Sequence, residues 1–416
     1  MPDTLTITAL KAWLVDQGIR AVPRPQMLNG FCTELINHGV PLVRMQLAQR
    51  ALHPEFGGIG FTWTRADGLN FEYFRRPDQA VDAWLNSPFY AMISSGEAEL
   101  CADLTGEEGT RFPIFSELRA QGGTSYFAHW QPIGGEGHRT YVPETMYREG
   151  VLASWTLDGD PGAAEAYRDI IRACFETLVV VLSAEGNREM GRELLKVYLG
   201  RDAGERVLSG EIQRGSSQLI DAVICLFDLR GFTALSEQLP GTVMVDLLND
   251  YFGHVVEIIQ AHGGNILKFM GDGVMAMFNL GTLEEDARAA LAAVRALAPR
   301  MEAVNAARIL AGLPQADYTL ALHAGEILYG NIGAPNRLDF TVIGPTVNLT
   351  ARIADMHRTV ERSVILSEHV RRAAGEVESD LVSVGRYMLR GVGEPIELFT
   401  LFDAPRASRS EGRDPV

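Results

Sequence analysis

The feature that most constrains this chain is a pair of short apolar runs separated by Gly271-Asp272-Gly273. The runs span residues 266–270 and 274–278, and an Asp-Gly pair between two such runs is a strong signal for a β-hairpin. A tight turn between the two strands would present the carboxylate of Asp272 at their shared end. Asp272 is therefore the first candidate for a functional side chain.

A second carboxylate is expected at the end of another strand. Residues 222–227 form a continuous apolar run that predicts a buried strand, and Asp228 follows directly. Two carboxylates on adjacent strand ends suit Mg²⁺, which keeps much of its water and takes one or two protein carboxylates together with substrate phosphates. Asp228 and Asp272 are therefore expected to form a magnesium site.

Three segments carry a resemblance to a known family. They are Phe-Asp-Leu-Arg-Gly-Phe-Thr at 227–233, Lys-Phe-Met-Gly-Asp-Gly at 268–273, and the stretch from Asp339 to Arg352. In order and spacing they resemble the signatures of class III nucleotidyl cyclases, and the resemblance covers about residues 217–402. It implies an α/β (α+β) fold in which a ferredoxin-like core has an antiparallel sheet covered by helices, and the order of predicted elements agrees.

The resemblance also implies a reaction and its cofactor. The chain is expected to be a lyase that converts ATP to 3′,5′-cyclic AMP and pyrophosphate by in-line attack of the ribose 3′-hydroxyl on the α-phosphate. Two Mg²⁺ or Mn²⁺ ions per active site would assist this attack. By match to the family, Asp228 and Asp272 would hold the metals, and the backbone carbonyl of Leu229 would be a further ligand.

Further site residues follow from the third segment and the C-terminal region. Asn348 and Arg352 are four residues apart on one predicted helix and therefore neighbours on one face. The family motif implies that Asn348 orients the ribose and that Arg352 stabilises charge on the α-phosphate in the transition state. Arg390 stands where the family usually has a lysine that holds the terminal phosphates, so the substitution keeps the charge.

Base selection is expected to depend on Lys268 and Thr341. Period-two alternation predicts that Lys268 shares a face with Ile266 and Met270. Lysine can donate to adenine N1 and a threonine oxygen can accept from the 6-amino group, whereas guanine reverses both requirements. Adenine fits better, and Thr341 resembles the residue of a bacterial adenylate cyclase subgroup. Guanylate cyclase activity and a catalytically inactive, nucleotide-binding regulator remain as alternatives.

Net charge, cysteine spacing and the length of apolar runs indicate which binding partners and which cellular location to expect. The chain has 416 residues and a formal net charge of −16, which argues against a nucleic-acid partner, because a phosphate backbone requires a basic field. Four cysteines without CxxC spacing are typical of reduced thiols. No apolar run is long enough to span a bilayer, so a cytoplasmic protein without a membrane span is expected.

The length predicts more than one domain. Residues 1–185 combine helical and strand-like runs and resemble a small α/β sensor domain of the GAF or PAS kind. The tryptophans of this part could line the cavity of a small-molecule ligand or fill the core, and the core is favoured. Residues 186–216 predict a helical connector, with the helix before it ending near Leu182. The cyclase domain is expected at 217–403 and a disordered tail at 404–416. Since the chain has one cyclase domain, the family implies a homodimer with shared active sites.

Overall fold

The computed structural model describes residues 4–50, 56–75, 82–133, 150–375 and 380–402. These residues form two compact units, residues 1–194 and 195–416, which are considered separately below. The boundary lies within helix α6 (Ala164–Leu199), in the stretch that the sequence assigns to the connector. The expected tail at 404–416 lies outside the described residues. No helix among the described residues combines the length and apolarity that crossing a membrane requires.

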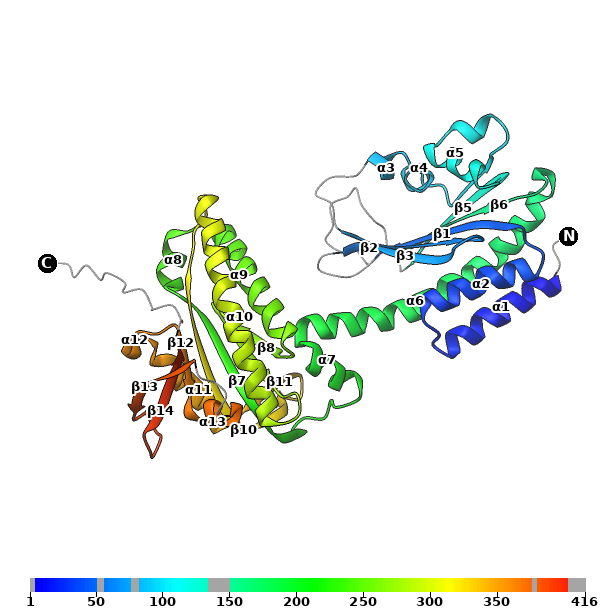
Figure 1. Ribbon diagram of the computed structural model, residues 1–416. Helices are drawn as coiled ribbons and strands as arrows, with labels where there is room; N and C mark the ends of the chain where they lie inside the picture. The colour runs from blue at the N-terminus through cyan, green and yellow to red at the C-terminus, as the bar shows by residue number, and fades with distance from the viewer. Residues whose placement is uncertain (1–3, 51–55, 76–81, 134–149, 376–379, 403–416) are drawn as a thin grey trace. The chain divides into compact units, whose positions relative to one another are not determined.

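The N-terminal unit is a six-stranded antiparallel sheet with helices on both faces (Figure 1). The strand order is β3-β2-β1-β6-β5-β4, with bounds Leu42–Arg50 (β1), Phe56–Thr64 (β2), Gly68–Arg75 (β3), Glu99–Asp103 (β4), Ser125–Pro132 (β5) and Gly150–Leu157 (β6). Helices α1 (Thr4–Ile19), α2 (Arg24–Asn37) and α6 pack on one face. The short helices α3 (Asp82–Leu85), α4 (Pro88–Ser95) and α5 (Pro113–Ala120) lie among residues of the other core. The expected α/β class is confirmed.

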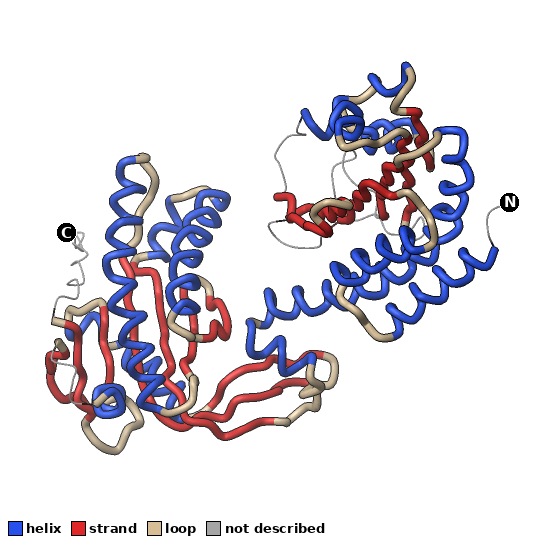
Figure 2. The backbone as a smooth tube through the Cα atoms, turned by 45° about the vertical axis from the view of Figure 1, so that its right-hand side comes forward, coloured by secondary structure: helices blue, strands red, loops and turns tan. Residues whose placement is uncertain are grey.

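The C-terminal unit is an eight-stranded sheet with the order β13-β14-β12-β10-β7-β9-β8, and β11 also pairs with β10. The bounds are Ser217–Arg230 (β7), Asn265–Met270 (β8), Gly273–Phe278 (β9), Asp317–Ala334 (β10), Arg337–Ile343 (β11), Val364–Ser367 (β12), Leu381–Tyr387 (β13) and Ile396–Leu401 (β14). β10 and β12 are parallel, and the other pairs described are antiparallel. Figure 2 shows the helices against these strands.

Helices α9 (Gly241–Ala261), α10 (Leu283–Leu310) and α13 (Glu368–Ala374) cover one face of this sheet and share its largest core. Thr282 and Glu285 form a capping box at the start of α10, which satisfies two backbone N–H groups. On the other side, α7 (Arg201–Leu208) and β11 contribute to a second core, and α11 (Pro345–Asp355) to a third. The remaining helices are α8 (Phe232–Gln238) and α12 (His357–Val360). This is the expected helix-covered fold.

Candidate active site

The two predicted carboxylates lie on adjacent strands. Asp228 is near the end of β7 and pairs in register with Gly273, the first residue of β9. The backbone N–H of Leu229 donates to the carbonyl oxygen of Asp272 at 3.1 Å. A Cβ at Gly273 would come within 3.0 Å of Asp228 Oδ1, so glycine leaves room for this carboxylate. The sheet thus holds Asp228 beside the turn that carries Asp272.

The turn itself is Gly271-Asp272, and Gly273 already belongs to β9. Gly271 has a positive φ of 66°, whereas the φ of Asp272 is not positive. This is the pattern of a type II′ hairpin turn. The predicted hairpin is therefore confirmed, but the residue that takes the left-handed conformation is Gly271, before Asp272, and not Gly273 after it. This places the Asp272 backbone where it can bond Leu229.

The chemistry of this pair fits a divalent cation. Loss of hydration and, secondly, the charge of Asp272 raise the pKa of Asp228 to about 6, although the side chain keeps access to solvent. A cation between the two carboxylates would relieve their repulsion. Among the described residues no group of three or more His, Cys, Asp or Glu side chains could hold a metal. Two carboxylates with a backbone carbonyl suit Mg²⁺, which retains water and substrate oxygens. The Leu229 side chain is buried, so this residue can offer only its backbone.

Lys268 lies on β8, but the prediction that it shares a face with Ile266 is wrong. A β-bulge separates the two residues: Ile266 pairs with Ala276, whereas Lys268 pairs with Met275. Ala276 belongs to the helix-covered core and Met275 to the core on the opposite face. The extra residue therefore turns Lys268 away from helices α9, α10 and α13, as bulges do next to functional sites. There its ammonium lies 3.3 Å from Asp339 Oδ2.

Thr341 is on the same strand as Asp339, two residues further along β11, so both side chains lie on one face. The Thr341 side chain is 7% exposed, and its Oγ1 has no hydrogen-bond partner within the described structure. A buried hydroxyl without a partner is costly unless a ligand supplies one. The sequence prediction missed Asp339, and its place two residues before Thr341 in a strand was the available signal.

Asn348 and Arg352 both lie on α11, which begins with Pro345 after Gly344. Asn348 is exposed, and Arg352 is half-buried. Both terminal nitrogens of Arg352 lie 3.5 Å from the position that a Cβ would take at Gly391. The predicted phosphate-binding residue Arg390 directly precedes this glycine and is exposed. The fold therefore brings Arg352 next to the segment that carries Arg390.

Within one chain the predicted site residues, together with Asp339, fall into three groups. Asp228 and Asp272 form the first, Lys268 with Thr341 and Asp339 the second, and Asn348 with Arg352 and Arg390 the third. Lys268 is on the edge strand β8, while Arg390 follows the opposite edge strand β13.

Residues 216–402 match the family described as the adenylate and guanylate cyclase catalytic domain. An uncharacterized protein of Mycobacterium tuberculosis is 32% identical over 223 residues, which are 53% of this chain and 38% of that protein, so the chain spans well under half of its relative. Among solved structures, the guanylyl cyclase Cya2 is 30% identical with a TM-score of 0.40, covering 45% of this chain and 95% of its own. The adenylyl cyclase CyaB from P. aeruginosa is 27% identical with a TM-score of 0.41, covering 46% and 99%.

Proposed function

We propose, from the premise that residues 216–402 are a class III adenylate and guanylate cyclase catalytic domain, that this chain is an adenylate cyclase. One observation carries the choice of base: the buried, unpartnered Oγ1 of Thr341 lies on the β11 face whose Asp339 holds the Lys268 ammonium. An acceptor and a donor side by side match the 6-amino group and N1 of adenine. Guanine would set the Lys268 ammonium against the N1–H donor, whereas the Thr341 hydroxyl could rotate to donate to O6, so Lys268 supplies the main discrimination.

The reaction would convert ATP to 3′,5′-cyclic AMP and pyrophosphate. The ribose 3′-oxygen loses its proton and bonds to the α-phosphorus, while the bond from this phosphorus to the oxygen bridging the β-phosphate breaks. Class III cyclases depend on divalent metals, and here Asp228, Asp272 and the Leu229 carbonyl would hold two Mg²⁺ or Mn²⁺ ions. Such ions, when bound, neutralise phosphate charge and favour the ionised 3′-oxygen.

The remaining groups would bind, orient and stabilise. Asn348 is exposed on α11, where its amide can hydrogen-bond the ribose. The Arg352 guanidinium would donate to the α-phosphate as charge grows on it in the transition state, where a fixed cation contributes several kcal/mol. Arg390 would hold the terminal phosphates, and its position beside Gly391 next to Arg352 supports a common phosphate-binding surface.

Cyclase domains bind nucleotide and typically form dimers, and we place each active site of this protein between two copies of the chain. Asp228 and Asp272 of one copy would face the other two groups of residues from its partner. The presence of both half-sets in a chain with one cyclase domain supports this arrangement, since a twofold axis then forms two equivalent sites.

The N-terminal unit would regulate the cyclase in response to a small molecule. All five tryptophans of the chain lie in this part, so ligand binding should change indole fluorescence as well as the cyclase rate. Removal of residues 1 to about 185 should abolish the rate response. An unchanged response in the shortened chain would place regulation elsewhere.

The deciding experiment compares turnover of ATP and GTP by the full chain at equal concentrations, with Mg²⁺ or Mn²⁺. A clear preference for ATP is expected, because the wrong base leaves buried polar groups unpaired, and this can discriminate by orders of magnitude. Comparable turnover of both nucleotides, or a preference for GTP, would contradict the adenylate assignment. Nucleotide binding without turnover would favour the inactive regulatory alternative.

A further inference from the structure

Helix α1 is apolar on two sides. Its inner side carries Leu10 and Leu14, which are 0% exposed in the core of the N-terminal unit. Its outer side carries Leu5, Val15 and Ile19, which are 80%, 47% and 80% exposed. A surface helix normally has one apolar stripe, and a helix that is apolar all round is normally covered on both sides. The outer side of α1 is therefore a candidate contact surface.

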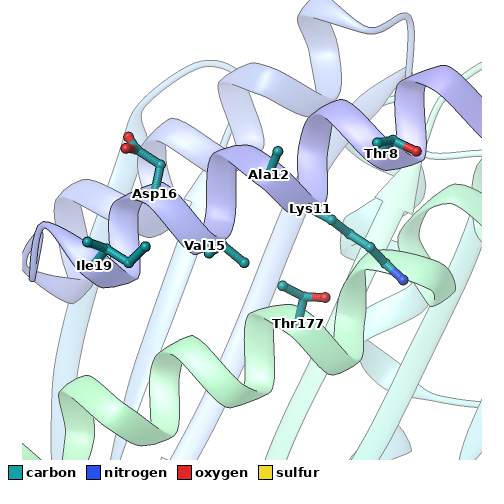
Figure 3. Close-up of a pocket in the computed structure, with 7 residues that line it drawn as sticks. All are labelled: Thr8, Lys11, Ala12, Val15, Asp16, Ile19 and Thr177. Atoms are coloured by element: carbon teal, nitrogen blue, oxygen red, sulfur yellow. The ribbon is translucent and has the colours of Figure 1, made fainter.

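This side borders a shallow, open depression between α1 and α6 (Figure 3). Its lining residues are Thr8, Lys11, Ala12, Val15, Asp16 and Ile19 of α1 with Thr177 of α6. The helices approach closely at Gly18, where a Cβ would lie 3.1 Å from a methyl group of Val181. Val180 of α6, which is 68% exposed, extends the apolar surface past Thr177. The surface thus has two helical walls fixed within one unit.

The outer residues of α1 are spaced as in a coiled coil. Leu5, Thr8, Ala12, Val15 and Ile19 follow one another at intervals of three, four, three and four, and all are exposed. This spacing gives the a and d positions of two heptads. Small and β-branched side chains predominate among them, so a second helix could approach closely.

The flanking charges indicate what that second helix is. With Ala12 at an a position, Lys11 takes the preceding g position and Asp16 the following e position, five residues later. In a parallel pair, a g residue meets the e residue of the next heptad on the partner helix, so Lys11 of each copy would meet Asp16 of the other. Within the chain Asp16 accepts a hydrogen bond from Gln17 Nε2 at 3.2 Å and pairs with the exposed Arg20 at 3.0 Å, and an exposed i,i+4 ion pair of this kind contributes little.

We propose that the outer face of α1 is a homodimer contact, in which α1 packs parallel to α1 of a second copy around a twofold axis. The face is self-complementary, because each helix carries both Lys11 and Asp16. The twofold axis therefore generates two equivalent Lys11–Asp16 ion pairs. At 1.5 Å per residue the 16-residue helix is only about 24 Å long. The contact would therefore add to a dimer formed by the cyclase domains, through raised effective concentration, rather than hold two chains alone.

A cysteine placed on this face tests the proposal in the full chain. For helices about 9 Å apart, an Ala12→Cys pair would have Cα atoms about 6 Å apart across the axis, within disulfide range. Ala9→Cys is the matched control: Ala9 is also exposed on α1, but at an e position it lies about 80° from the line joining the two helices, which separates its Cα pair by about 9 Å. Both variants carry Cys101→Ser, because Cys101 is exposed whereas Cys32, Cys174 and Cys225 are buried.

Under mild oxidation, Ala12→Cys should form a disulfide-linked dimer about ten times faster than Ala9→Cys. Equal rates, or no linked dimer for either, would overturn the proposal and leave this face to a different partner. The proposal rests on a dimer formed by the cyclase domains, which is tested separately by mixing inactive variants, so failure of the α1 contact and failure of the shared site can be told apart.

Charge exchange tests the orientation of the pair. In the Ala12→Cys background, Lys11→Glu or Asp16→Lys alone should slow linkage several-fold, because each creates like-charge contacts at two places. The double variant should recover the parental rate. If single and double variants link at the same rate as the parent, the Lys11 to Asp16 contact and the parallel register are wrong.

Discussion

At the scale of single residues, Asp228 carries a charge that the folded protein does not favour. Its pKa is raised to about 6, above the unfolded value near 3.8, so ionised Asp228 at pH 7 opposes folding when no cation is bound. Because Asp228 is a proposed metal ligand, Asp228→Asn should lower cyclase activity at least about a hundredfold. In chelator-treated protein the free energy of unfolding should stay equal or rise by up to about 1 kcal/mol, after allowance for solvent screening.

Asp221→Asn is the matched control on the same strand, because this exposed aspartate lies seven residues from Asp228. Activity assays and thermal unfolding with and without Mg²⁺ provide the measurement. Mg²⁺ should stabilise the parent and the Asp221→Asn protein but not Asp228→Asn. Full activity of Asp228→Asn would remove this residue from the metal site.

Thr341 offers a second test, because its hydroxyl contributes nothing to the unliganded fold. The Oγ1 atom is buried without a partner, so Thr341→Val should leave the free energy of unfolding unchanged or raise it by about 1 kcal/mol. The same change should lower kcat/KM for ATP about tenfold or more and reduce the preference over GTP.

Thr346→Val is the contrasting variant, since the Thr346 hydroxyl donates to the Glu326 carbonyl at 2.7 Å and is also buried. It should lose about 1 kcal/mol of stability by leaving that carbonyl unsatisfied. Urea unfolding and kinetics with both nucleotides separate the cases. A Thr341→Val protein with unchanged ATP kinetics would show that this hydroxyl does not contact the base.

How much of the site was predictable depended on how local the signal was. Asp272 and Asp228 follow apolar runs directly, so their positions could be read from neighbouring residues. The side of the sheet on which Lys268 lies could not be predicted from neighbouring residues, because the bulge after Ile266 arises from the pairing of β8 with β9. Asp339 lies 71 residues from Lys268 in the sequence, and neither segment alone predicts the contact between them.

At the scale of elements, the short helix α12 is joined to β12 through a buried histidine. His357 Nδ1 contacts the carbonyl oxygen of Arg362 at 2.7 Å, while Nε2 is buried without a partner in the described structure. Burial lowers the pKa of His357 to about 4; the backbone contact opposes this effect, and the charge of the nearby Arg230 contributes to it. The unfolded chain therefore binds a proton more readily than the folded one.

The sign of the pH effect follows directly. The pKa of His357 in the folded protein lies below the unfolded value of about 6.5. Above pH 7 the histidine is therefore neutral in both states and does not change the free energy of unfolding, whereas this free energy decreases as pH falls from about 6.5 towards 4. Relative to the parent, His357→Gln should gain on the order of 2 kcal/mol between pH 7 and pH 5. Urea unfolding of both proteins at the two pH values measures this difference and cancels the other titrating groups. A constant difference would contradict the assigned burial.

Two regions contain longer elements than the sequence indicates. Alternating runs at 318–323 and 326–332 favour two separate strands, but the structure has one strand, β10, because Gly325 does not turn the chain. It lets α11 approach instead: a Cβ there would lie 2.8 Å from Thr346 Oγ1. The helix expected to end near Leu182 continues to Leu199, since the charged stretch after it still has helical spacing. A packing partner distant in sequence decided the first case, and the spacing of the charged stretch decided the second.

At the scale of the whole molecule, the proposed shared site predicts that two inactive variants restore activity when mixed. Asp228→Ala should inactivate both sites of its own homodimer by removing a metal ligand, and Arg352→Ala should do so by removing transition-state charge. In a mixed dimer one site collects both changes and the other collects neither. If subunits exchange freely, half of the dimers are mixed and each has one intact site, so activity should return to roughly a quarter of the unmodified protein.

A control pair with both changes in the same half-site sharpens this test. Asp228→Ala mixed with Asp272→Ala should stay inactive, because each site of the mixed dimer then lacks one carboxylate whichever copy supplies it. Two different affinity tags, purified in sequence, establish that mixed dimers are present in both experiments. Activity that fails to return with Arg352→Ala while mixed dimers are recovered would mean that each chain builds its site alone. The three groups of residues would then have to converge on one nucleotide within a single cyclase domain, with Asp228 and Asp272 facing the other two groups of their own chain.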